Sequence, residues 1–200
     1  MAIVVVGVPG VGKTFFARRF AETFAAPLVS EDKIRYTLFS KHTYGKNEQA
    51  MVDQVARLMI DELFVAGKTF VLDGGYGSRV SRDNITALAG QYGFRTLIVW
   101  VQTDEPTARR RAQHRSLKVA GDQYKQSLTP EQWTSLAKAF TAPDIEKKEV
   151  NSVVISGKHT YAAQAKIVLK KIVESRTDLL RTDQPINRED KTGRSIFPQY

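Results

Sequence analysis

Apolar residues follow two different spacings along this chain, and the two spacings alternate. Five short, mainly apolar runs predict buried strands, at residues 3–6, 27–30, 69–73, 94–101 and 153–156. Elsewhere apolar residues recur every three to four positions, which predicts helices at residues 13–24, 31–39, 48–64, 81–92, 104–115, from 129 onward and 161–173. Strands that alternate with helices predict a three-layer α/β fold, in which a five-stranded parallel sheet lies between helices.

The first loop carries the clearest chemistry. It reads GVPGVGKT over residues 7–14, a full match to G-x-x-x-x-G-K-[ST], and it lies between a predicted strand and a predicted helix. Glycines there let backbone N–H groups converge on phosphates, and the helix N-terminus adds a favourable dipole. The lysine can reach the outer phosphates and the threonine hydroxyl can ligate Mg²⁺, so ATP and Mg²⁺ are the predicted cofactors. The predicted nucleotide-binding residues are Gly10, Val11, Gly12, Lys13 and Thr14.

The third predicted strand ends on an acidic residue. Asp73 stands where P-loop proteins place the carboxylate that supports Mg²⁺, so Thr14 and Asp73 are the predicted metal residues. Gly74 follows in place of the glutamate with which motor ATPases activate water, and the sequence has no guanine-reading Asn-Lys-x-Asp pattern after a late strand. The first observation disfavours a motor ATPase, and the second disfavours a GTPase. Phosphoryl transfer to a hydroxyl is the simplest remaining activity.

Two pairs of residues are candidates for the acceptor and the lid. Asp32 and Arg35 lie three residues apart at the start of a predicted helix, on one face and at the same sheet edge as the phosphate loop. Asp32 can accept the proton of an acceptor hydroxyl, and Arg35 can hold the acceptor or the transferred group. Arg111 and Arg115 can close over the triphosphate from a helical lid at about residues 109–128. The alternative explanations are an acidic helix start with an exposed arginine for the first pair and a solvated basic helix face for the second.

Four motifs follow one another between residues 7 and 115, and they carry a resemblance that covers about residues 1–175: GVPGVGKT, VSEDKIRYTLF, FVLDGGYGSRVSRDNI and LIVWVQTDEPTARRRAQHR. In order and spacing they resemble the P-loop kinases around polynucleotide 5′-hydroxyl kinase and the zeta toxins, which are often described as AAA domain proteins. The resemblance implies a kinase-type P-loop fold. It also implies these roles: Lys13 on the donor phosphates, Asp32 as general base, Arg35 orienting the acceptor, Arg111 and Arg115 as lid arginines, Arg79 and Arg82 as acceptor contacts, and Gly157 near the adenine.

Charge bears on the choice of acceptor. The chain has 30 Lys and Arg against 21 Asp and Glu, and residues 109–125 hold six basic residues and one acid. This distribution suits a polyanionic partner, although a solvated basic surface is as good an explanation. The sequence thus predicts an ATP-dependent kinase acting on a hydroxyl, with a polynucleotide 5′-hydroxyl as the first candidate. A small-molecule kinase (for a nucleoside, nucleotide sugar, sugar or antibiotic) and a non-catalytic ATP-dependent binding switch are the alternatives.

The remaining features of the composition mainly exclude classes of site and of protein. The chain has no cysteine, which removes thiol catalysis, Cys-based zinc sites and disulfides, and its three histidines are far apart in sequence. No apolar stretch approaches the ~20 residues of a membrane span, so we expect a cytoplasmic protein without a membrane or an obligate protein partner. Residues 1–175 are the predicted kinase domain, and residues 176–200 are a predicted polar tail.

Overall fold

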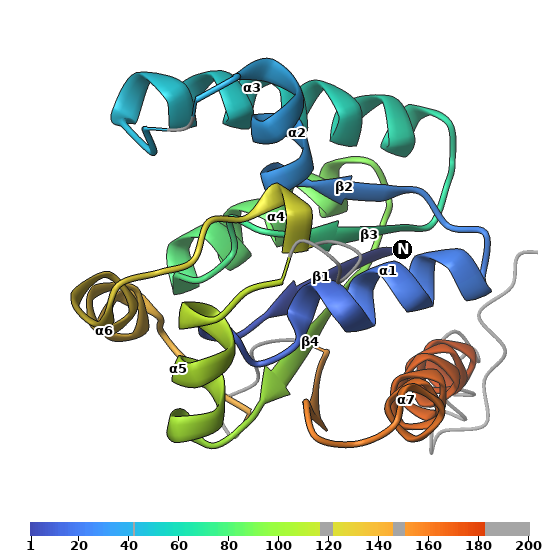
Figure 1. Ribbon diagram of the computed structural model, residues 1–200. Helices are drawn as coiled ribbons and strands as arrows, with labels where there is room; N and C mark the ends of the chain where they lie inside the picture. Colours follow the sequence, from blue (N-terminus) through green and yellow to red (C-terminus); the bar gives the residue numbers. More distant parts are fainter. Residues whose placement is uncertain (42, 117–121, 146–150, 183–200) are drawn as a thin grey trace, which may run out of the picture.

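The computed structural model describes residues 1–41, 43–116, 122–145 and 151–182 (Figure 1). The strands are β1 (Ala2–Val6), β2 (Leu28–Ser30), β3 (Phe70–Asp73), β4 (Thr96–Gln102) and β5 (Ser152–Ser156). The helices are α1 (Lys13–Thr23), α2 (Glu31–Leu38), α3 (Lys46–Val65), α4 (Arg79–Gln91), α5 (Glu105–Gln113), the 3-10 turn η1 (Asp122–Tyr124), α6 (Pro130–Ala139) and α7 (Tyr161–Thr182). The strands form one parallel sheet in the order β2-β3-β1-β4-β5, which confirms the predicted fold class.

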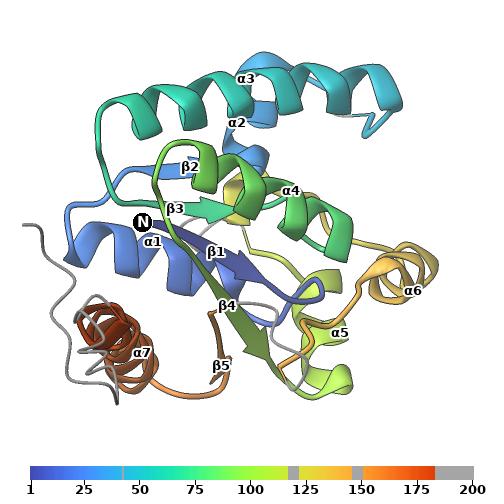
Figure 2. The same ribbon diagram turned by 180° about the vertical axis from the view of Figure 1, so that it is seen from behind.

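Alternate residues of each strand face opposite helical layers. Ile3 of β1 packs with residues of α1 and α7, among them Phe16 and Phe20, whereas Val4 packs with residues of α3 and α4. Figures 1 and 2 show these two layers from opposite sides of the sheet. Because both faces are buried, the strands are apolar throughout instead of alternating with polar residues.

Strands β1, β2 and β3 end together at the edge that carries the candidate site. The parallel register places Val5 and Ser30 on either side of Asp73. The loop after β1 is the phosphate loop, residues 7–14, and α2 begins directly after β2 with Asp32 in its first turn. The topology therefore brings the phosphate loop, Asp32 and Asp73 to one sheet edge, as the sequence predicts.

Two helices end at positions other than those expected. Helix α5 stops at Gln113, because His114 leaves the helical conformation, so Arg115 lies beyond the helix that was expected to include it. Helix α7 continues to Thr182 although its apolar pattern fades near residue 173, since a helix satisfies its backbone hydrogen bonds without an apolar face. The first residues of the predicted tail are thus helical. Neither α7 nor any other described helix is long and apolar enough to cross a membrane.

Parts of two predicted regions lie outside the described residues. Residues 117–121 belong to the predicted lid, and residues 183–200 form most of the predicted tail. The lid boundaries at about 109–128 and the domain boundary at 175 therefore stay predictions.

Candidate active site

The phosphate loop is held in a shape that needs glycine. Gly10 has a φ of +88°, and a Cβ atom there would lie 1.9 Å from the carbonyl oxygen of Ala108 in α5. Gly12 then precedes α1 without a side-chain hydrogen bond to the first-turn N–H groups, which leaves these donors to an anion. Lys13 Nζ donates to the carbonyl oxygens of Gly7 at 2.8 Å and Val8 at 3.0 Å. Burial, followed by the nearby Lys125 charge, lowers the pKa of Lys13 to about 8.

The two predicted metal residues are in direct contact. Thr14 Oγ1 donates to Asp73 Oδ2 at 2.7 Å. Asp73 is only 2% exposed, and its Oδ1 atom has no hydrogen-bond partner in the described part of the chain. A buried carboxylate oxygen without a partner is costly unless a cation compensates it. A hydroxyl beside such a carboxylate is a donor set that fits Mg²⁺.

Asp32 contacts a residue that the sequence did not single out. Its Oδ2 atom lies 2.9 Å from Nζ of Lys125, which follows η1, and Lys125 also donates to Thr14 Oγ1. The Lys125 side chain is 14% exposed. Basic character in residues 109–125 was visible in the sequence, but a lysine outside any helix has no periodic spacing that would mark it.

Arg35 is engaged by helix α3. It is 3% exposed, its Nη1 atom lies 2.6 Å from Glu48 Oε1, its Nη2 atom donates to Gln49, and its guanidinium lies over the Tyr44 ring. Although burial acts in the opposite direction, hydrogen bonds from Arg35 and Thr43 lower the pKa of Glu48 to about 2. The sequence predicted that Arg35 would hold the acceptor, yet both of its Nη atoms already have protein partners.

The two predicted lid arginines have different surroundings. Arg111 Nη1 donates to the carbonyl oxygen of Gly157 at 3.2 Å. A Cβ atom on Gly157 would lie 1.9 Å from the Val11 carbonyl oxygen, so this glycine packs directly on the phosphate loop. Arg115 lies beyond α5, and its charge acts on both Lys13 and Lys125. The structure therefore places Arg115 within electrostatic range of Lys13 and Arg111 against Gly157, on the predicted adenine side.

Two other side chains support loops at the site. Arg82 is 2% exposed and its Nη1 atom donates to the carbonyl oxygens of Tyr76, Gly77 and Thr141, so it fastens the loop after β3. Trp133 of α6 donates from Nε1 to the Pro9 carbonyl oxygen of the phosphate loop at 3.0 Å. Arg79 is exposed and pairs with Asp83 at 3.6 Å. Of the two predicted acceptor contacts, Arg82 thus binds main-chain carbonyls and Arg79 lies at the surface.

Glu31 is a half-buried acid beside Asp32 that the sequence did not single out. Its side chain packs on the turn after β3, where Cβ atoms on Gly74 and Gly75 would lie 3.0 and 1.9 Å from it. Gln49 Nε2 donates to Glu31 Oε2 at 3.4 Å and to Asp53 at 2.7 Å. Burial, together with the nearby Asp53 charge, raises the pKa of Glu31 to about 7.

This shift predicts a pH dependence of stability. The folded protein binds the Glu31 proton more tightly than the unfolded chain does, so its stability falls as the pH rises from the ordinary glutamate pKa through about 7. Glu31→Gln should flatten this fall, which urea unfolding at about pH 5 and about pH 8 would measure. The exposed Glu62→Gln change on α3 is the control. An equally steep fall in both variants would contradict the assignment.

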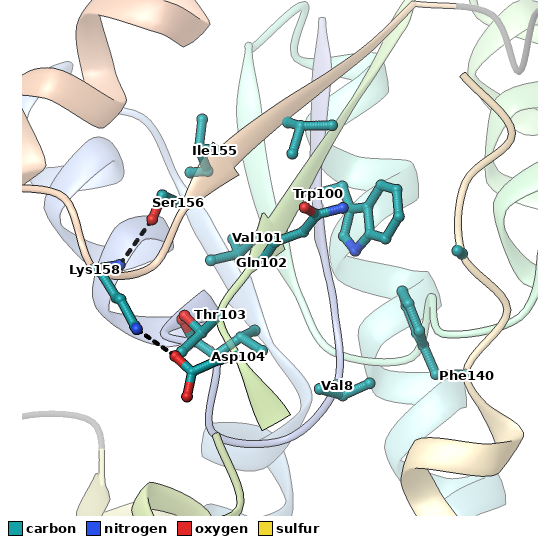
Figure 3. A pocket seen from close by; sticks show the side chains of 13 residues that line it. Val8, Trp100, Val101, Gln102, Thr103, Asp104, Phe140, Ile155, Ser156 and Lys158 are labelled. Atoms are coloured by element: carbon teal, nitrogen blue, oxygen red, sulfur yellow. Dashed lines mark hydrogen bonds and ion pairs between the residues drawn. The ribbon is translucent and has the colours of Figure 1, made fainter. Parts of the chain in front are cut away.

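A separate pocket of about 640 Å³ lies beside the phosphate loop, at the ends of β4 and β5 (Figure 3). Trp100 and Phe140 line one side, and the Lys158–Asp104 ion pair lies on another. Val8 and Val11 of the phosphate loop contribute to its wall, whereas Lys13, Thr14 and Asp73 do not line it. The candidate phosphate site is therefore formed by the phosphate loop with Lys13, Thr14 and Asp73, and it is distinct from this pocket.

The chain is similar to a known protein family and to several solved structures. The family described as AAA domain matches residues 3–143. Similar solved structures include a gluconokinase from Sinorhizobium meliloti, with 17% identity and a TM-score of 0.61 over 91% of this chain and 97% of that chain. A second is a sugar kinase from a Janibacter species, with 13% identity and a TM-score of 0.61 over 86% of this chain and 94% of that chain. A third is Chaetomium thermophilum Kti12 in complex with ADP-AlF3, with 18% identity and a TM-score of 0.61 over 87% of this chain and 98% of that chain. Among curated protein sequences, none matches this chain significantly.

Proposed function

Because the chain belongs to the AAA domain family and has a P-loop kinase fold, we propose that it transfers the γ-phosphoryl group of ATP to a hydroxyl of a small polyhydroxyl molecule. The observation that carries this proposal is the contact of Thr14 with Asp73. Asp32 lies close to this pair, because Lys125 contacts both Asp32 and Thr14. The family and the neighbours support a kinase. None of the three neighbours is described as a polynucleotide kinase or a zeta toxin, so that narrower resemblance stays a prediction.

The charges on the acceptor side favour a small molecule over a polynucleotide. Glu31, Asp32 and Asp53 lie on this side, and Gln49 connects two of them. The guanidinium of Arg35 is already paired with Glu48. A polyanion needs cations that neutralise its phosphates, whereas carboxylates and an amide are suitable partners for the hydroxyls of a neutral acceptor. The sugar-kinase neighbours are consistent with this choice.

Each residue then has a task. In the reaction, the acceptor oxygen bonds to the γ-phosphorus, the bond to the bridging oxygen of ADP breaks, and Asp32 takes the hydroxyl proton. Lys13 and the N–H groups of the phosphate loop bind the donor phosphates. Thr14 and Asp73 would hold Mg²⁺, which neutralises phosphate charge when bound.

The remaining predicted site residues act around this centre. The charge of Arg115 acts on Lys13, so we assign to Arg115 the stabilisation of charge on the transferred group, and to Arg111 with Gly157 a border of the nucleotide site. For Arg35 we propose a positioning role, since it joins α2 to α3 through Glu48 and Gln49. It thereby fixes the helix that carries Asp32.

The test is transfer of labelled γ-phosphate from ATP, with Mg²⁺, to a matched acceptor panel. We expect labelling of one or more neutral sugars or polyols, and little labelling of 5′-hydroxyl DNA or RNA. Labelling of a polynucleotide alone, with binding that falls steeply with salt, would overturn the small-molecule proposal in favour of the polynucleotide alternative. Tight ATP binding without transfer to any acceptor would instead favour a nucleotide-dependent binding switch.

A further inference from the structure

Lys125 connects the donor and acceptor halves of the candidate site. Its Nζ atom is a hydrogen-bond donor to Thr14 Oγ1 of α1 at 2.5 Å and lies 2.9 Å from Asp32 Oδ2 of α2. Lys125 itself follows η1, where the neighbouring Tyr124 packs edge-on against Tyr36 of α2, with ring centroids 5.3 Å apart. The contact between Tyr124 and Tyr36 holds this segment against α2, and from there the ammonium reaches both Thr14 and Asp32.

Lys125 lies beside two acids: Asp32 is its ion-pair partner, and the charge of Asp73 also acts on it. The hydroxyl of Thr14 donates to Asp73 and accepts from Lys125, so the ammonium uses the oxygen that would ligate Mg²⁺. Two cations cannot both occupy the lone pairs of one hydroxyl oxygen at close range without strong repulsion.

We propose that Lys125 is an internal counter-cation of the metal site, which competes with a divalent metal for Thr14 and orients the carboxylate of Asp32. This rests on the proposed phosphotransfer function for the identity of the metal site. Lys125 acts through Thr14 and Asp32, so it is a positioning residue. Its consequence is that metal binding has to displace the ammonium from Thr14.

The proposal predicts an unusual gain from losing a charged residue. Lys125→Met should bind Mn²⁺ at least about tenfold more tightly than the wild-type protein when no nucleotide is added, because the competing charge is gone. Free Mn²⁺ is measured by its paramagnetic resonance signal. Lys138→Met, an exposed lysine on α6, is the matched control and should leave Mn²⁺ affinity unchanged.

Two further variants locate the effect and guard against misfolding. Lys125→Arg keeps the charge and should keep wild-type Mn²⁺ affinity, while Lys125→Met combined with Thr14→Ala should lose the gain. Equal affinity of the wild-type protein and Lys125→Met, within about twofold, would overturn the proposal, as would a gain that survives Thr14→Ala. If Lys125→Met does not fold, Lys125→Gln replaces it under the same criteria.

The proposed orientation of Asp32 by Lys125 is tested separately, by steady-state kinetics. Loss of Lys125 should lower kcat for the acceptor identified in the panel, with little change in the KM for ATP, and Lys125→Arg should restore part of kcat. An unchanged kcat would overturn this part. Metal binding requires neither acceptor nor turnover, so failure of the kinase proposal and failure of the counter-cation proposal are distinguishable.

Discussion

Asp32→Ala should reduce phosphoryl transfer by about 10²–10⁴-fold while the Kd for ATP stays within about threefold of the wild-type value. Asp32 lies on the acceptor side, at the start of α2, and its carboxylate forms an ion pair with Lys125. Its removal therefore takes away the proton acceptor and leaves the donor cradle in place. Single-turnover transfer and equilibrium ATP binding measure the two quantities separately.

Asp83→Ala is the matched control for this change. Asp83 is an exposed aspartate on α4 that pairs only weakly with Arg79, so its loss should leave both quantities unchanged. Transfer at near wild-type rate in Asp32→Ala would show that another group accepts the proton. Loss of ATP binding in Asp32→Ala would show that α2 belongs to the donor side.

The donor half of the site could be predicted because its chemistry lies in contiguous sequence. A phosphate loop needs particular residues at fixed spacing between a strand and a helix, and residues 7–14 supply them. Asp73 could be placed because the carboxyl ends of parallel strands share one edge, and the register with Val5 and Ser30 agrees. Local pattern and topology together were sufficient to place these residues at one sheet edge.

The acceptor half could not be predicted to the same depth, because its side chains are defined by partners distant in sequence. Glu31 packs on the Gly74–Gly75 turn, and Lys125 reaches Thr14 across 111 positions. No periodicity links such residues before the chain is folded. For the same reason the sequence indicated that Arg35 was near the site but did not reveal Glu48 as its partner.

Arg35→Met should lower the thermal midpoint by roughly 10 °C, because it leaves the Glu48 carboxylate buried without its guanidinium partner. The double variant Arg35→Met, Glu48→Met removes both charges and should regain at least about half of that loss, since a paired apolar replacement is often nearly neutral. Calorimetric melting of the wild-type protein, both single variants and the double variant gives the coupling between the two residues.

The same double variant separates the two roles considered for Arg35. A guanidinium that touches the acceptor would leave the KM for the acceptor raised even after stability returns. A guanidinium that only joins α2 to α3 would let KM recover together with the midpoint, because Asp32 returns to its place. We expect recovery, since the Nη atoms of Arg35 bind Glu48 and Gln49. A stable double variant with a persistently raised acceptor KM would return Arg35 to the acceptor-binding role.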